Sequence, residues 1–450
     1  MSPAPLSEAD RRLLLRLLEL PTAGLLETGP GAAPPRLREA QDAYARAAAA
    51  LGFAAVHHAA PDPARVDRAD VPLAVREAAA ENPGFLAAEP SLVLRLGPPR
   101  PRAATAMFNV HLDTVSGWEP PRFDGESFHG RGAVDAKGPA VALLAGVRAA
   151  LRAEPSIGTG SGIGVLIQAV AGEEGGAMGT FGTRPLVEQG HVGRLNLFCE
   201  PTGLRYLPRS TAAMTARVRV AGRDSVDDRP GGGHNATVLL GFLAQHLAAS
   251  LAERAGETEP VCVAGLCTGT RHNRVYGSGD LLLNLPYAGT EAGRRLGAAV
   301  AAALDGGLDA FAARFAQAPG FALTAAEARQ VTHLEWLKSG LPTLDCRDPW
   351  MHRLLGERAG LALWPPDEQA FTCDAVWMDG VPGTAAAVLG PGDLAANNAH
   401  ADGEFARLAE LEGFAEAVAR VLTAFAREYR PDPRACAPPA PPSRTGDRSA

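Results

Sequence analysis

The sequence has few cysteines, no long uncharged apolar run and no cluster of basic residues. Six cysteines occur in 450 residues, and no two of them form a CxxC pair. This usage is typical of buried thiols in a reducing compartment rather than of a disulfide framework, so we expect a cytoplasmic protein. Cys262 and Cys267 lie close together in the sequence, and we expect these thiols to be buried as well.

The missing apolar and basic runs argue against two classes of partner. No stretch approaches the roughly 18 uncharged apolar residues that a membrane-spanning helix needs. The first twenty residues place Arg11, Arg12 and Arg16 among leucines, which predicts an amphipathic helix capped near Ser7 rather than a signal peptide. Because the formal net charge is -7, the chain offers no electrostatic footprint for nucleic acid. We expect neither a membrane nor a nucleic-acid partner.

The first two hundred residues alternate short apolar runs with helical patterns. Runs at 91–97, 106–112, 164–170 and 195–199 have the length of buried strands, and helical periodicity covers 139–152 and 178–189. Such alternation predicts an α/β fold with a mixed, mostly parallel sheet and helices on both faces.

The pattern changes after residue 205. Segments 211–222 and 279–287 resemble half-exposed strands, and helical patterns follow them at 235–254 and 290–316. The α/β pattern then returns at 381–392, and a long helix is predicted over 405–427. We therefore predict a larger domain formed by 1–205 and 339–430, a smaller inserted α+β domain over 206–338, and a disordered tail over 431–450.

Acidic and histidine side chains gather where the predicted strands end. Open α/β sheets bind ligands at this edge, and a buried carboxylate there must be paired or bound to a cation. Imidazole and carboxylate together, without a matching set of lysines or arginines, favour zinc or a neighbouring metal ion. The residues concerned are His111, Asp113, Asp135, Glu173, Glu174, Glu200 and His400.

Each of these residues also has an ordinary interpretation when taken alone. Asp135 could cap the helix that follows it, and Glu200 could cap the turn before Pro201. His400 could be a plain loop histidine, and adjacent glutamates such as Glu173 and Glu174 are usually solvated. The ordered set, rather than any single member, favours the metal site.

The order of these segments resembles the dinuclear zinc hydrolases that include aminoacylase, acetylornithine deacetylase, succinyl-diaminopimelate desuccinylase and glutamate carboxypeptidase. The matching segments are HLDTV (111–115), FHGRGAVDAKG (128–138), AGEEGGAMGT (171–180), CEPTG (199–203), LGPG (389–392) and AHADGE (399–404). The resemblance implies a zinc-peptidase-like fold, with the metals in the larger domain.

The resemblance also implies a role for each site residue. His111 and His400 would each bind one of two metal ions, Asp135 would bridge the ions, and Glu174 and Glu200 would complete one site each. Asp113 would orient the imidazole of His111, and Glu173 would be the general base. The expected metal is zinc, with cobalt or manganese as alternatives.

Two positions of the inserted domain depart from the family. Val226 stands where the family has a histidine that stabilises the oxyanion, often from the partner subunit, and Pro286 stands where it has a carboxylate-binding arginine. His234 or His272 could replace the histidine, and Arg271 or Arg274 the arginine. Asn273 matches the family pattern. The substrate-binding residues predicted on this basis are His234, Arg271, Asn273 and Arg274.

These features predict a metal-dependent hydrolase that cleaves an amide bond in a short peptide or an N-acyl amino acid. A homodimer through the inserted domain is the assembly that the resemblance implies. Val226 and Pro286 favour an alternative, in which a catalytically silent relative binds a metabolite or peptide in the same cleft. Cleavage of a carbamoyl or ester bond is a third hypothesis that the sequence does not separate from amide hydrolysis.

Overall fold

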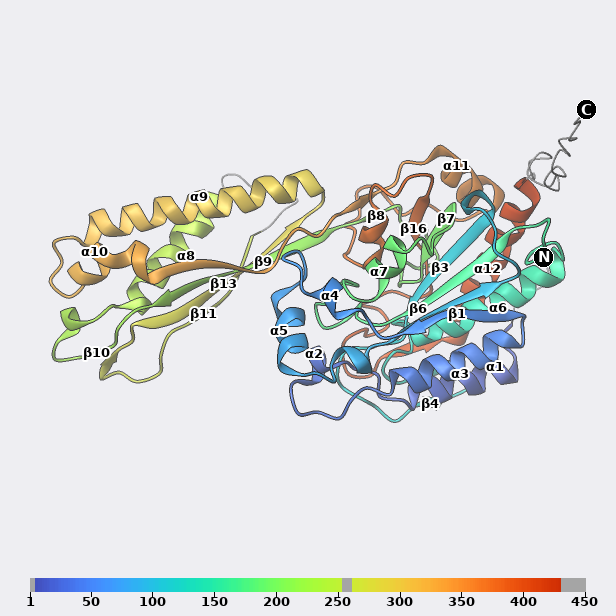
Figure 1. The fold of residues 1–450 in the computed structure, drawn as a ribbon, viewed down its shortest axis with the longest axis horizontal. Coiled ribbons are helices and arrows are strands. Elements are labelled where there is room, and N and C mark those ends of the chain that lie inside the picture. Colours follow the sequence, from blue (N-terminus) through green and yellow to red (C-terminus); the bar gives the residue numbers. More distant parts are fainter. Residues whose placement is uncertain (1–4, 253–260, 430–450) are drawn as a thin grey trace, which may run out of the picture.

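The computed structural model describes residues 5–252 and 261–429, so the tail predicted over 431–450 lies outside the described residues. Two lobes are visible in Figure 1, a larger one around a six-stranded sheet and a smaller one around a four-stranded sheet. The α/β class with an inserted α+β domain, which the sequence predicted, is confirmed.

The larger sheet is mixed and mostly parallel. Its order is β1-β2-β6-β3-β7-β16, in which β3 pairs in parallel with β6 and β7, and β7 with β16. The two strands at one edge pair in antiparallel fashion. The strands are β1 (Phe53–Ala59), β2 (Ser91–Leu96), β3 (Thr105–His111), β6 (Gly164–Val170), β7 (Leu195–Phe198) and β16 (Ala385–Val388).

Successive side chains of the buried strands point to opposite faces of the sheet, and each face has its own apolar cluster. Phe108 packs with the long helices of one face, whereas Met107 belongs to the cluster on the other face. The first face is covered by α1 (Glu8–Leu18), α3 (Leu37–Ala49), α6 (Lys137–Ala153) and α12 (Leu408–Glu428), and the second by α7 (Thr183–Glu188) and the 3₁₀ helix η5 (Asp374–Met378). Shorter helices are α2 (Leu25–Thr28), α4 (Pro63–Val66), α5 (Leu73–Glu81) and α11 (Pro349–His352).

Two predicted helices begin later than the sequence suggested. The helix expected over 178–189 starts only at Thr183, because Met178 and Gly179 have φ angles of 54° and 61°, outside the helical region. The helix expected from residue 405 starts at Leu408, because Phe405–Arg407 form strand β17. The first helix is capped by Ser7, whose hydroxyl accepts from the backbone N–H of Asp10.

The inserted domain has an antiparallel sheet with helices on one face. Its order is β11-β13-β9-β14, and apolar side chains of β9 and β13 alternate with half-exposed ones. The strands are β9 (Ala212–Ala221), β11 (Cys262–Cys267), β13 (Ser278–Tyr287) and β14 (Thr332–Lys338); the helices are α8 (Ala236–Ala252), α9 (Thr290–Phe315) and α10 (Ala322–Val331).

Helix α9 is, among the described residues, the one helix long and apolar enough to cross a membrane by length and composition. Its apolar residues Val300, Leu304 and Phe311 are buried with Leu283 of the sheet. The helix is therefore the core helix of the inserted domain.

The edge position of β11 corrects the prediction of buried thiols. Cys262 and Cys267 are both exposed, because β11 pairs with only one neighbour and its side chains face solvent. The prediction was wrong for these two cysteines, whereas Cys199 and Cys373 are buried.

Short strand pairs complete the structure. β8 (Arg209–Ser210) pairs with β15 (Leu344–Asp345) where the chain passes between the lobes, and β17 pairs with β5 (Ser127–His129), which pairs with β4 (Arg122–Phe123). β10 (Ser225–Val226) pairs with β12 (Arg274–Val275). Figure 1 shows β10 at the end of the inserted domain that lies farthest from the larger sheet.

Candidate metal centre

Three neighbouring parallel strands end at one edge of the larger sheet and bring predicted site residues to it. His111 is the last residue of β3, Glu173 and Glu174 follow β6, and Glu200 lies just beyond β7. Because β6, β3 and β7 are adjacent and parallel, their carboxyl ends meet at the same place. The strand order alone therefore gathers an imidazole and three carboxylates.

Asp135 lies at the centre of the cluster, between two histidines. Its Oδ1 is 2.8 Å from Nε2 of His111, and its Oδ2 is 3.1 Å from Nε2 of His400. Glu200 Oε2 lies 3.7 Å from Nε2 of His111, and Glu174 Oε1 lies 3.0 Å from Nε2 of His400. The cluster thus has two sides that share Asp135, and on each side the ligand atoms lie within 4.8 Å of one another.

The cluster carries more negative than positive charge. Among the described residues, no lysine or arginine forms an ion pair with Asp113, Asp135, Glu173, Glu174 or Glu200. The ion-pair partners of Asp113, Asp135, Glu174 and Glu200 are the two histidines.

Burial raises the pKa of Glu173 well above its usual range, and the neighbouring carboxylates of Glu174 and Glu200 raise it further. Burial also raises the pKa of Glu174 to about 7, although the hydrogen bond with His400 opposes this shift. Crowded carboxylates of this kind need a cation, and imidazole nitrogen with carboxylate oxygen suits zinc-like ions. The donor set fits one divalent ion on each side of Asp135.

Asp113 orients its neighbours through two different groups. The Nδ1–H of His111 donates to the backbone carbonyl of Asp113 at 2.9 Å, which leaves Nε2 facing the cluster. The carboxylate Oδ2 of Asp113 accepts from the backbone N–H groups of Gly172 (3.0 Å) and Glu174 (3.1 Å). The carbonyl therefore sets the imidazole, and the side chain holds the loop that presents Glu174.

The predicted substrate-binding residues are not brought to this cluster within one chain. His234 is buried in the inserted domain, where its Nδ1 accepts from Arg223 N–H at 2.8 Å and its Nε2 lies 3.0 Å from Glu327. Arg274 pairs with Asp224.

The remaining residues of this group are exposed at the tip of the inserted domain, next to the short strands β10 and β12. They are Arg271, His272 and Asn273.

Two further acids near the cluster were not assigned a role from the sequence. Glu404 accepts hydrogen bonds from the loop that carries Asp135. Asp374 is fully buried, accepts from the hydroxyl of Thr183, and has its pKa raised to about 8 by burial. Glu404 could have been found from its place at the end of the AHADGE segment. Asp374 lies in FTCDAVW (371–377), which resembles a family segment near the active site, but its packing against the loop before α7 depends on the tertiary fold.

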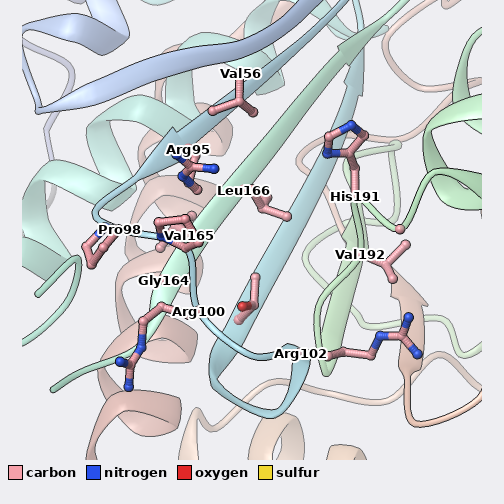
Figure 2. A pocket seen from close by; sticks show the side chains of 13 residues that line it. Val56, Arg95, Pro98, Arg100, Arg102, Gly164, Val165, Leu166, His191 and Val192 are labelled. Carbon is pink, nitrogen blue, oxygen red and sulfur yellow. The ribbon is translucent and has the colours of Figure 1, made fainter. Parts of the chain in front are cut away.

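A pocket of about 330 Å³ lies at the opposite end of the same strands, where β6 and β3 begin. Arg95, Arg100 and Arg102 line it, but Figure 2 shows their guanidinium groups pointing in different directions. Each guanidinium donates to a backbone carbonyl, of Gly97, Gly160 and Pro382 respectively. A binding site needs convergent polar groups, which this pocket lacks.

Comparison with known proteins assigns the family. Residues 107–424 match peptidase family M20/M25/M40, and the chain belongs to this family. The resemblance to dinuclear zinc hydrolases is thereby confirmed, and the protein is a metal-dependent hydrolase of a family that binds two metal ions.

Solved structures share the fold, and one further relative matches a short stretch of the sequence. A stretch of 34 residues is 59% identical to part of the [LysW]-lysine/[LysW]-ornithine hydrolase of Sulfurisphaera tokodaii, which is 8% of this chain and only 10% of that protein. The aminopeptidase PepT of Bacillus cereus has a TM-score of 0.64 at 14% identity, covering 93% of this chain and 99% of its own. The YXEP protein of Bacillus subtilis, described as a dinuclear metal-binding peptidase, has a TM-score of 0.57 at 10% identity, covering 93% and 99%.

Proposed function

We propose that the protein hydrolyses an amide bond in a short peptide or an N-acyl amino acid, with two zinc ions held on either side of Asp135. The observation that carries the proposal is the pair of Asp135 oxygens, each facing a different histidine at 2.8 and 3.1 Å. His111 and Glu200 would hold one ion, and Glu174 and His400 the other. Cobalt or manganese could take the place of zinc, because the donor set of nitrogen and oxygen suits all three.

Glu173 is the group that moves the proton in this proposal. When bound, the metal pair supplies Lewis acidity, which polarises a substrate carbonyl and lowers the pKa of water. The carboxylate of Glu173 takes a proton from the attacking water and passes it to the nitrogen of the leaving amine.

The substrate is expected to differ from that of the carboxypeptidases, since Pro286 occupies the position of the expected arginine. Pro286 lines a pocket of about 450 Å³ between the lobes together with Arg209. The guanidinium of Arg209 donates to the carbonyls of Pro365, Pro366 and Glu368, which use part of its hydrogen-bonding capacity. Arg271 and Arg274 stay the proposed carboxylate-binding residues, because they lie within two residues of Asn273, which matches the family pattern. Strong preference for a simple N-acetyl amino acid would contradict an altered specificity.

A homodimer is proposed because the tip of the inserted domain, with β10, lies at the end of that domain farthest from the larger sheet (Figure 1), whose strand ends carry the residues of the metal centre. Substrate contacts by Arg271 and Asn273 then require the tip of a partner subunit. The exposed edge strand β11, with Val263 and Leu266 each 40% exposed, supplies an unpaired surface in the same domain.

The first experiment compares wild type with Glu173→Gln for metal content and for turnover of a panel of dipeptides, N-acyl amino acids, carbamoyl compounds and esters. We expect about two zinc equivalents in both proteins, and activity about 10²–10⁴-fold lower in the variant. Two metals without turnover of any substrate would support the silent binder that Val226 and Pro286 favour. A wild-type protein that folds but binds no metal would refute the proposal.

A further inference from the structure

His400 is held differently from the other predicted ligands. His111 ends a buried strand, whereas His400 lies in a loop, has a φ of 62°, and has a side chain that is 50% exposed. A non-glycine residue in this left-handed region is held there by its surroundings. The distance between His400 and Asp135 must therefore be set by contacts of the surrounding loop.

Glu404 makes those contacts. Its Oε1 accepts from the backbone N–H groups of Val134 (3.0 Å) and Asp135 (3.3 Å). Its Oε2 accepts from Gly132 N–H (3.0 Å) and from the guanidinium of Arg131 (2.8 Å). One buried carboxylate thus takes up four donors of the loop that ends at Asp135.

The backbone around Glu404 ties the same two segments together. Gly130 N–H donates to the carbonyl of Glu404 at 3.0 Å, and Phe405 pairs with His129 between β17 and β5. At the other end of the His400 loop, the side chain of Asn397 donates to the carbonyl of Phe405 at 3.1 Å. The His400 loop and the Asp135 loop are therefore joined at Glu404.

Glycine at position 132 allows this arrangement. Its φ is 89°, and a Cβ there would lie 2.8 Å from Cδ of Lys137 and 3.0 Å from Cγ2 of Thr114. The backbone can therefore turn its N–H toward Glu404 only without a side chain. Charge-assisted bonds of this kind are stronger than neutral ones, and losing the carboxylate would leave buried donors unpaired.

The two sides of the metal centre depend on Glu404 to different degrees. On one side, His111 and Glu200 follow strands of the sheet, and the carbonyl of Asp113 fixes the imidazole. On the other side, only Glu174 follows a strand, and His400 depends on its loop. A shift of the joined loops would move His400 and leave His111 and Glu200 in place.

We propose that Glu404 is a positioning residue that joins the Asp135 loop to the His400 loop, and so sets metal affinity on the Asp135–Glu174–His400 side of the centre. The inference rests on the proposed function in that it requires an ion on each side. If Glu404 has this role, replacing it should weaken metal binding on the His400 side, although Glu404 would contact neither ion.

The experiment is a zinc titration of chelator-stripped, full-length protein, with wild type and Glu404→Gln compared by calorimetry in the presence of a competing chelator. We expect wild type to bind two ions. In Glu404→Gln, we expect the first ion to bind as in wild type and the second to bind about 10–100-fold more weakly.

Asp10→Asn is the matched control. Asp10 is also buried and also pairs with an arginine, Arg148 at 3.0 Å, but it lies in the first turn of helix α1, where it accepts from Ser7 N–H. Loss of this ion pair should leave both zinc affinities unchanged.

The proposal would be overturned if Glu404→Gln bound both ions equally more weakly than wild type, or if neither affinity changed. If Glu404→Gln does not fold, Arg131→Gln takes its place, since it removes one of the four donors. We then expect the affinity for the second zinc ion alone to fall by a few-fold. Unchanged zinc affinity would overturn the coupling.

Hydrogen exchange separates this inference from the proposed function. Without metal, at least one of the amides of Gly132 and Val134 should exchange about tenfold faster or more in Glu404→Gln than in wild type, because glutamine keeps only one of the two acceptor oxygens. If wild type bound no second ion, the proposed function would fail and the metal-affinity part of this inference with it. Equal exchange rates in the two proteins would refute the loop coupling by itself.

Discussion

The edge of the larger sheet and the tip of the inserted domain hold polar groups in different ways. At the sheet edge, His111, Asp135 and Glu200 are buried, and their side chains lie within 3.7 Å of a partner in the cluster. At the tip, Arg271 and Asn273 are exposed. The first region is assembled by strand order within one chain.

The difference shows where a protein can hold a metal centre and where it can only offer side chains for contact with another surface. Parallel strands fix the positions of their ends, so a crowded group of carboxylates can be held together and its charge met by metal ions. A two-stranded tip cannot bury such a group. Its side chains contribute to a site only when another surface closes over them, and in this protein we propose that the surface is the catalytic lobe of a partner subunit.

Asp135→Asn should give the largest effect, because Asp135 is shared by both sides of the cluster. We expect loss of both metal equivalents and a fall in kcat/KM of roughly 10³-fold or more, with the fold retained. Metal analysis and circular dichroism check this. Asp10→Asn, in helix α1, should change neither the metal content nor kcat/KM. A variant of Asp135 that keeps two tightly bound ions would contradict the bridging role.

Subunit complementation tests whether the tip of one subunit contributes to the metal centre of its partner. Asn273→Ala should lower kcat/KM about 10–100-fold, the effect of losing a hydrogen bond in the reaction. If the tip acts on a partner subunit, mixing Asn273→Ala with Glu173→Gln under conditions of subunit exchange should restore about a quarter of wild-type activity per chain, because in the mixed dimers one of the two sites is intact.

The matched control mixes Glu173→Gln with Asp135→Asn. Both changes lie in the catalytic lobe, so every site in the mixed dimer carries one defect and no activity should return. Recovery in the control, or none in the test mixture, would contradict a shared site.

The smallest expected effect concerns Glu89, whose protonation should make the stability of the folded protein depend on pH. Burial, with a further contribution from Asp113, raises the pKa of Glu89 from 4.5 to about 8. Between these pH values, the folded protein holds a proton that the unfolded chain releases. The free energy of unfolding therefore falls as pH rises, by about 1.4 kcal/mol per pH unit from this group.

Glu89→Gln removes this dependence, since the amide does not titrate. Urea unfolding of the chelated protein should show the variant gaining stability relative to wild type from pH 5 to pH 8. Parallel curves for the two proteins would show that Glu89 does not keep its proton in the folded state.

Much of the larger domain could be predicted because its strands are buried on both faces. The apolar runs 91–97 and 164–170 correspond to β2 and β6 almost residue for residue. Strand β1, which contains His57 and His58, was missed because it is an edge strand with mostly exposed or half-buried side chains, and the adjacent histidines interrupt its apolar run. The late start of α7 was missed because a backbone turn at Met178 and Gly179 leaves no clear break in the helical pattern.

The sequence by itself determined the family, the fold class and the residue types of the metal centre, because strand ends and glycine-rich loops leave a local pattern. Only the tertiary structure decided that each oxygen of Asp135 faces a different histidine and that the carbonyl of Asp113 sets His111. It also decided that Glu404 joins two loops about 270 residues apart in the chain. Such contacts depend on how distant segments pack, and no local sequence signal records that packing.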